Sequence, residues 1–98
     1  MAQFIALVRR DLERFSEADF TPLLEPEAER ARQLYAHGLL RAIWSRGDAP
    51  GAVLLFEVES LDDVNGALDS LPLKAKGMLT VDAIVPLTPY RGFGPRSA

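Results

Sequence analysis

The sequence contains no cysteine and only one histidine, His37, among its 98 residues. The absence of cysteine excludes disulfide bonds, a thiolate nucleophile and a cysteine-bound metal ion. A single histidine with scattered acids does not make a metal-ligand set either, so we predict no metal site. A chain without cysteine fits a reducing compartment, and we expect a cytoplasmic protein.

Long apolar runs and a strong excess of one charge are also missing. The apolar run at residues 4–8 is followed, not preceded, by two arginines, which is unlike a signal peptide. No stretch approaches the roughly 20 apolar residues of a membrane span. A net charge of −3 argues against nucleic acid or an anionic membrane as the main partner. We therefore expect a small domain that associates with further copies of itself, because association would add to its limited buried surface.

Apolar periodicity and turn residues predict the order strand, helix, strand, strand, helix, strand. The predicted strands are residues 3–9, 39–46, 52–59 and 78–87, and the second helix is residues 60–71. The first strand is apolar on both faces and is expected to be central in its sheet. The first helix ends at His37, because Gly38 suits the left-handed residue that follows a helix. It begins either near Glu25 or earlier with a bend at Pro26.

This order is that of an α+β, ferredoxin-like βαββαβ fold with a four-stranded antiparallel sheet. Both helices should cover one face of the sheet, and the other face is too apolar to remain in water. We therefore predict a dimeric α/β barrel, in which the open face packs on a second copy. Residues 1–87 form this domain, and residues 88–98 are an irregular tail that could contact another subunit. Strict alternation in the last strand puts Leu79, Val81, Ala83 and Val85 on one face.

Glu27 is the best candidate for chemistry, because it lies on the apolar stripe of the first helix near Ala31 and Leu34. Desolvation of a carboxyl raises its pKa toward the range of a general base. The alternative is that the helix is rotated so that Glu27 lies at the edge and pairs with Arg30.

Two further charged residues lie within predicted strands. Arg41 could anchor a substrate carboxylate with two hydrogen bonds, or it could pair with Glu57 on the neighbouring strand. Asp82 is a second candidate acid, and pairing with Lys74 or Lys76 is its structural explanation.

Three aromatic residues are candidates for the wall of a binding pocket. Trp44 and Phe56 can either fill the core or stack on a ligand. Tyr35 is expected on the buried edge of the first helix, where it could donate a hydrogen bond or simply pack.

A set of residues with characteristic spacing runs through most of the chain. It consists of Glu27, Ala31, Leu34, Gly38, Arg41, Trp44, Phe56, Val58, Ser60, Leu71, Pro72, Leu73, Met78, Val81 and Asp82. In order and spacing this set resembles the muconolactone isomerase family, which are small dimeric α/β-barrel proteins of aromatic catabolism.

The resemblance implies an isomerase that shifts a double bond in an unsaturated lactone without a cofactor. A glutamate in the first helix is the family's proposed proton shuttle, and it matches Glu27. The expected site then has Glu27 as the catalytic acid and base. A small-molecule substrate would be bound by Arg41, Trp44, Tyr35 and Phe56. The protein would be a homodimer or a higher homo-oligomer.

The chain also departs from the family pattern. Phe4 and Ala6 stand where the family carries histidine and lysine, and Ala49, Pro50 and Ala52 replace histidine, tyrosine and asparagine. These departures indicate a changed, larger or more apolar substrate. Two other functions stay open, namely a cofactor-free monooxygenase or cyclase acting on a polycyclic aromatic or polyketide substrate, and a non-catalytic oligomeric binding module.

Overall fold

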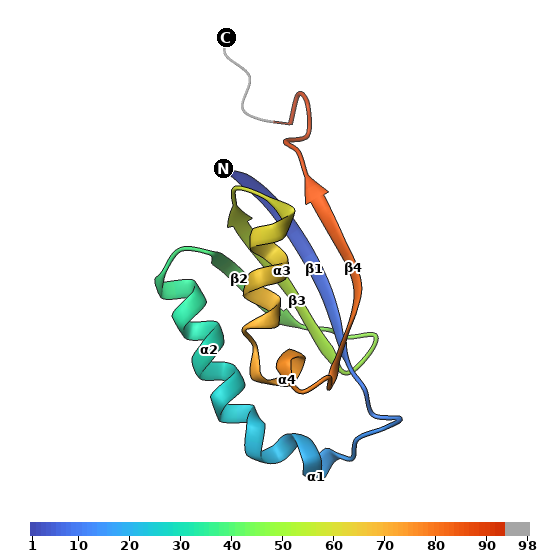
Figure 1. Ribbon diagram of the computed structural model, residues 1–98. Helices are drawn as coiled ribbons and strands as arrows, with labels where there is room; N and C mark the ends of the chain where they lie inside the picture. The colour runs from blue at the N-terminus through green and yellow to red at the C-terminus, as the bar shows by residue number, and fades with distance from the viewer. Residues whose placement is uncertain (94–98) are drawn as a thin grey trace.

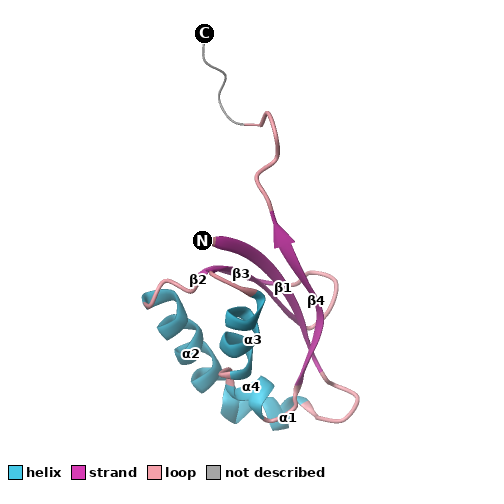
Figure 2. Cartoon of the chain, turned by 45° about the horizontal axis from the view of Figure 1, so that its top comes forward, coloured by secondary structure: helices cyan, strands magenta, loops and turns pink. Residues whose placement is uncertain are grey.

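One antiparallel sheet of four strands carries all the helices on one of its faces (Figures 1 and 2). The structure is a computed structural model and describes residues 1–93. Its elements are β1 (Ala2–Arg10), α1 (Glu17–Phe20), η1 (Thr21–Leu23), α2 (Leu24–Ala36), β2 (Leu40–Ser45), β3 (Gly51–Val58), α3 (Leu61–Asp69), α4 (Pro72–Ala75) and β4 (Leu79–Leu87). The predicted α+β, ferredoxin-like fold is confirmed.

The first strand is central, as predicted, because the order across the sheet is β2-β3-β1-β4. Its pairing with β3 is regular and sets Phe4 opposite Phe56. Alternate residues of β1, namely Phe4, Ala6 and Val8, are buried under the helices. The same alternation therefore directs the next residue in the series, Arg10, toward the helical side.

Two short helical turns precede α2. They decide whether the first helix begins near Glu25 or begins earlier and bends at Pro26. Ser16 and Asp19 form a complete capping box that starts α1. A 3-10 turn follows, and α2 then begins at Leu24. Pro26 falls within the first turn of α2, where a backbone N–H has no partner inside the helix. Gly38 ends the region with a φ of 82°, as predicted.

The last strand changes face at a β-bulge, which the alternation pattern did not predict. The register between β1 and β4 shifts so that Asp82 is the additional residue. Val81 packs against the core, and beyond the bulge Ile84 does so instead of Ala83. The predicted placement of Ala83 on the same face as Val81 is therefore wrong.

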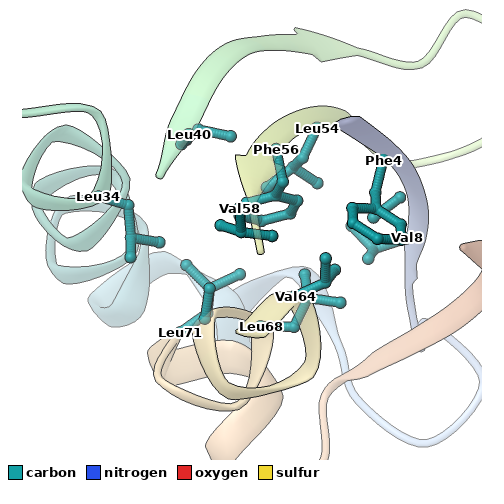
Figure 3. Close-up of a cluster of buried hydrophobic side chains, with 12 residues drawn as sticks. Phe4, Val8, Leu34, Leu40, Leu54, Phe56, Val58, Val64, Leu68 and Leu71 are labelled. Atoms are coloured by element: carbon teal, nitrogen blue, oxygen red, sulfur yellow. The ribbon is translucent and has the colours of Figure 1, made fainter. Parts of the chain in front are cut away.

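The core lies between the sheet and the helices, where side chains from all the main elements meet (Figure 3). A second, smaller cluster of Phe20, Leu73 and Met78 lies beside it. Leu73 reaches this place because Pro72, predicted only to end the second helix, also begins the separate helix α4.

The face of the sheet turned away from the helices is apolar in its middle and polar at both ends. Its apolar side chains are Ile5, Leu7, Trp44, Val53, Leu55 and Val85. At one end Gln3 donates a hydrogen bond to Glu57 at 3.1 Å. At the other end Arg9 and Arg46 both bind Asp82. We call this surface the open sheet face.

The chain leaves the sheet after Leu87, and residues 88–93 extend away from the domain (Figure 1). Tyr90 and Phe93 are 80% and 84% exposed, and their rings touch edge to face. The rest of the predicted tail, residues 94–98, lies outside the described residues. Within residues 1–93, no helix has the length and apolar character needed to cross a membrane.

Candidate active site

A cavity of about 310 Å³ lies between α2 and the strand ends at one end of the sheet. One wall is α2, the opposite wall comes from β1, β2 and β3, and Leu73 of α4 lies at the base. Most of the lining is aliphatic. Only Glu27, Arg10 and Ser45 bring polar side chains into it, so a molecule bound here would meet few, well-defined polar groups.

Glu27 lies on the cavity side of α2, where the apolar stripe predicted it. Its Oε1 accepts a hydrogen bond from the backbone N–H of Leu73 at 3.0 Å. Burial raises the pKa of the Glu27 carboxyl, while the Leu73 N–H and the charge of Arg10 act in the opposite direction. The predicted alternative, a pair with Arg30, is wrong, because Arg30 donates to Ser70 and to Gln33.

Arg10 is the residue that the sequence interpretation missed. It is the last residue of β1, and its guanidinium carbon lies 5.4 Å from the centre of the Phe20 ring. Within residues 1–93 it forms no ion pair with a carboxylate. The signal was present in the alternation of β1, since Arg10 continues the inward series of Phe4, Ala6 and Val8. The cavity therefore holds a cation beside a carboxyl of raised pKa.

Gly51 lets the first residues of β3 lie close to β1 beside this cavity. A Cβ atom at position 51 would stand 2.0 Å from the carbonyl oxygen of Val8 and 2.9 Å from the Cα of Arg9. The preceding residue, Pro50, accepts a hydrogen bond from the backbone N–H of Arg10 at 2.8 Å. The position of Arg10 thus depends on a close approach of two backbones that only glycine permits.

Arg41 does not join Glu27. It is exposed at an irregularity in the pairing of β2 with β3 and does not line the cavity. The predicted pair with Glu57 is absent, because Glu57 accepts a hydrogen bond from Gln3 instead.

The three aromatic candidates occupy three different environments. Phe56 is fully buried in the core, as one of its two interpretations predicted. Trp44 is 52% exposed on the open sheet face, so the core interpretation of Trp44 is wrong in the single chain. Tyr35, expected at a buried edge, is 64% exposed on α2 and faces a groove beside β2. None of the three lines the cavity that contains Glu27.

Asp82 belongs to a charge network on the open sheet face and not to the cavity. Its carboxylate binds Arg9 at 3.0 Å and Arg46 at 2.6 Å, whereas Lys74 pairs with Asp69. The predicted pairing with lysine is therefore wrong. Hydrogen bonds from Arg9 and Arg46 lower the pKa of Asp82, which keeps it ionised and makes it a poor proton carrier. Residues 1–93 contain no cluster of three potential metal ligands.

Comparison with known proteins gives a family and a structural neighbour. The family model for muconolactone delta-isomerase matches residues 7–92. No curated protein matches the sequence. Among solved structures, the chain is similar to 5-chloro-2-hydroxyhydroquinone dehydrochlorinase from Burkholderia phenoliruptrix AC1100, in complex with 2,5-dihydroxybenzoquinone. The TM-score is 0.66 at 16% identity, over 92% of this chain and 95% of that one, a likeness that shows the fold alone.

Proposed function

The chain belongs to the muconolactone delta-isomerase family, and on this basis we propose that it moves a double bond in an unsaturated lactone, or a related carbonyl compound, by cofactor-independent proton transfer. The observation that carries this proposal is the cavity, in which a carboxyl of raised pKa and a guanidinium stand among aliphatic side chains. Proton transfer at carbon needs these two groups, a movable proton carrier and a stabiliser of the negative charge that develops.

Glu27 acts as the proton carrier in the proposed reaction. Its carboxylate removes a proton from the saturated ring carbon next to the double bond. The electron pair of the broken C–H bond enters the conjugated system, and the carbonyl oxygen gains the negative charge of a dienolate. The Glu27 carboxylic acid then returns the proton to the other end of this system. The carbonyl re-forms, the double bond has moved, and no atom or electron is gained or lost.

Arg10 stabilises the dienolate oxygen in this scheme. The guanidinium carries several N–H donors in a fixed planar arrangement, so it can donate hydrogen bonds to this oxygen. The aliphatic lining strengthens this interaction because it keeps the local dielectric constant low. Arg10 thus takes the role of anion anchor that the sequence alone assigned to Arg41.

The proposed reaction can be tested with α-angelica lactone, a small neutral lactone whose double bond can move into conjugation. We expect the protein to convert it to the conjugated isomer, as followed by ultraviolet absorbance. In deuterium oxide the product should carry deuterium at the carbon that receives the proton, unless Glu27 returns the same proton. Turnover that requires dissolved oxygen would instead indicate the monooxygenase alternative, and absence of turnover on every lactone tested would contradict the proposal.

Replacing Arg10 by methionine is expected to reduce kcat/KM about 10- to 100-fold, because one charge-assisted hydrogen bond to the transition state is lost. Methionine retains a long apolar stem that can still pack against Phe20. The matched comparison is Arg41→Met, which removes the same charge outside the cavity and should leave kcat/KM near the parental value. If Arg41→Met is the slower variant, the anchor is Arg41, as the sequence predicted.

We also propose that the functional unit is a homodimer or a higher homo-oligomer formed through the open sheet face. The apolar middle and polar ends of this face match the usual anatomy of a protein interface. A sheet face with so many apolar side chains would otherwise remain in contact with water. The exposed rings of Tyr90 and Phe93 offer a further apolar contact for a neighbouring subunit.

Leu55→Lys is expected to convert the oligomer into smaller species, because it places a charge in the middle of the open sheet face. Leu55 is only half-buried in the single chain, so the lysine can reach solvent in the monomer and the fold should persist. Leu61→Lys is the matched control, since Leu61 is 49% exposed at the start of α3. Light scattering should give a lower mass for Leu55→Lys alone, and an unchanged mass would contradict the proposed interface.

A further inference from the structure

A second hollow, which we call the tail groove, lies between α2 and β2 beside the cavity of Glu27. Its volume is about 600 Å³. Three residues, Ala28, Ala31 and Ile43, line both the cavity and the tail groove. The two hollows therefore adjoin along these three side chains, close to Glu27.

The tail groove is lined almost entirely by apolar atoms. Beyond the shared residues its walls come from Tyr35, Leu40, Ala42 and the stem of Arg32. The Arg32 guanidinium is engaged by Glu25 and Glu29 on the same helix, so its charge is already neutralised. The groove offers shape and apolar contact but no free ion for a polar ligand to pair with.

On the side of α2, small side chains form the junction between the two hollows. Ala28 and Ala31 stand one turn apart on α2, and a larger residue at either position would narrow the passage. From Ala28 to Tyr35 the helix rises about 10 Å, which is long enough for a chain of several carbons. Tyr35 and Ile43 are 64% and 48% exposed, so a chain in the groove would cover apolar surface that now faces water.

We infer that the tail groove binds an unbranched apolar chain attached to the substrate whose reacting ring lies against Glu27. The substrate class is then an unsaturated lactone or related carbonyl compound that carries an alkyl chain, which rests on the proposed function. The groove shares three lining residues with the cavity, and this favours a part of the substrate over a second copy of the protein as its occupant. The open sheet face is the surface with the extent and anatomy for self-association.

The test uses butenolides with γ-alkyl chains from methyl to octyl, together with the saturated γ-lactones, which cannot isomerise. In the parent protein, kcat/KM for the butenolides and affinity for the saturated lactones should rise about fourfold for each added methylene, until the groove is filled. Tyr35→Lys places a charge at the far wall and should abolish this dependence for the longer chains. Leu61→Lys places the same charge at an exposed apolar side chain outside the groove and the open sheet face, and it should preserve the dependence.

The outcomes separate this inference from the proposed function. Chain-dependent binding of saturated lactones that is lost in Tyr35→Lys, without turnover of any butenolide, would support the groove and overturn the isomerase. Turnover that does not depend on chain length would overturn the groove and leave the isomerase. A fall in mass by light scattering in Tyr35→Lys, with no effect of chain length, would show that a second copy fills the groove and would also overturn the inference.

Discussion

Glu27→Gln is expected to lower kcat for lactone isomerisation by about 100- to 10,000-fold, the range that general acid–base groups contribute. Glutamine keeps the size of the side chain and can still accept the hydrogen bond from the Leu73 N–H. It cannot take up or return a proton. Because little else changes in the cavity, KM should change far less than kcat. Turnover equal to that of the parent would exclude Glu27 as the proton carrier.

The stability of the same variant provides a readout that does not depend on knowing the substrate. Burial raises the pKa of Glu27 in the folded protein, so the folded state favours the protonated carboxyl. The parent therefore loses stability as pH rises through this pKa, whereas glutamine does not ionise. We expect the free energy of unfolding of Glu27→Gln, relative to the parent, to increase from acidic to neutral pH. If denaturant titrations give the same difference in the free energy of unfolding between variant and parent at every pH, the pKa of Glu27 is not raised.

In activity assays the same pKa sets the pH profile. Glu27 must be ionised to accept a proton, so kcat/KM should rise with pH through the raised pKa of its carboxyl. Arg10→Met removes a charge that lowers this pKa, so the rise in its profile should move to higher pH. Arg41 stands outside the cavity, and Arg41→Met should keep the parental profile.

Gly51→Ala is expected to reduce the free energy of unfolding by about 3 kcal/mol, because the added methyl group must displace backbone and not a flexible side chain. The Cβ would lie 2.0 Å from the Val8 carbonyl oxygen, so β3 and β1 would have to separate at this point. The hydrogen bond between the Arg10 N–H and Pro50 belongs to the same contact and should weaken. Activity should then fall together with stability, since Arg10 would move.

Gly47→Ala is the matched control for this substitution. Gly47 lies in the same hairpin connection, has no positive φ, and has open space where a Cβ would be. Its replacement should be neutral or stabilise by about 0.4 to 1 kcal/mol through the unfolded chain. Urea titration of both variants checks the pair, and equal stabilities would contradict the close approach of β1 and β3.

The spacing of apolar residues and the positions of glycine and proline were sufficient to predict the fold and the side of α2 that Glu27 occupies. Three features each indicate one arrangement, namely the apolar stripe of α2, the glycine after it and the apolar character of both faces of β1. Gly38 is left-handed because it follows the end of α2, and β1 is central because both of its faces are apolar. The spacing of apolar residues predicts an element reliably where one of its faces must be buried.

The polar partners of the candidate site were not predictable in the same way. The alternation of β1 directs Arg10 toward the helices, but it does not reveal that Arg10 and Glu27 line the same cavity. Asp82 was expected to pair with a nearby lysine, but the sheet brings it to Arg9 and Arg46 from distant parts of the chain. The bulge at Asp82 depends on the pairing of β4 with β1, which lies far away in the sequence.

The central position of β1 also affects the order in which the protein can fold as it is synthesised. Both neighbours of β1 come later in the chain, since β3 begins at residue 51 and β4 ends at residue 87. The first strand made must therefore wait for β3 before it can pair and for β4 before both of its edges are covered, and pairing over such long sequence separation is slow. Until β3 is made, the apolar segment from Phe4 to Val8 has no permanent partner. The two arginines that follow it supply the nearby charge that discourages such a strand from pairing with another unfinished chain.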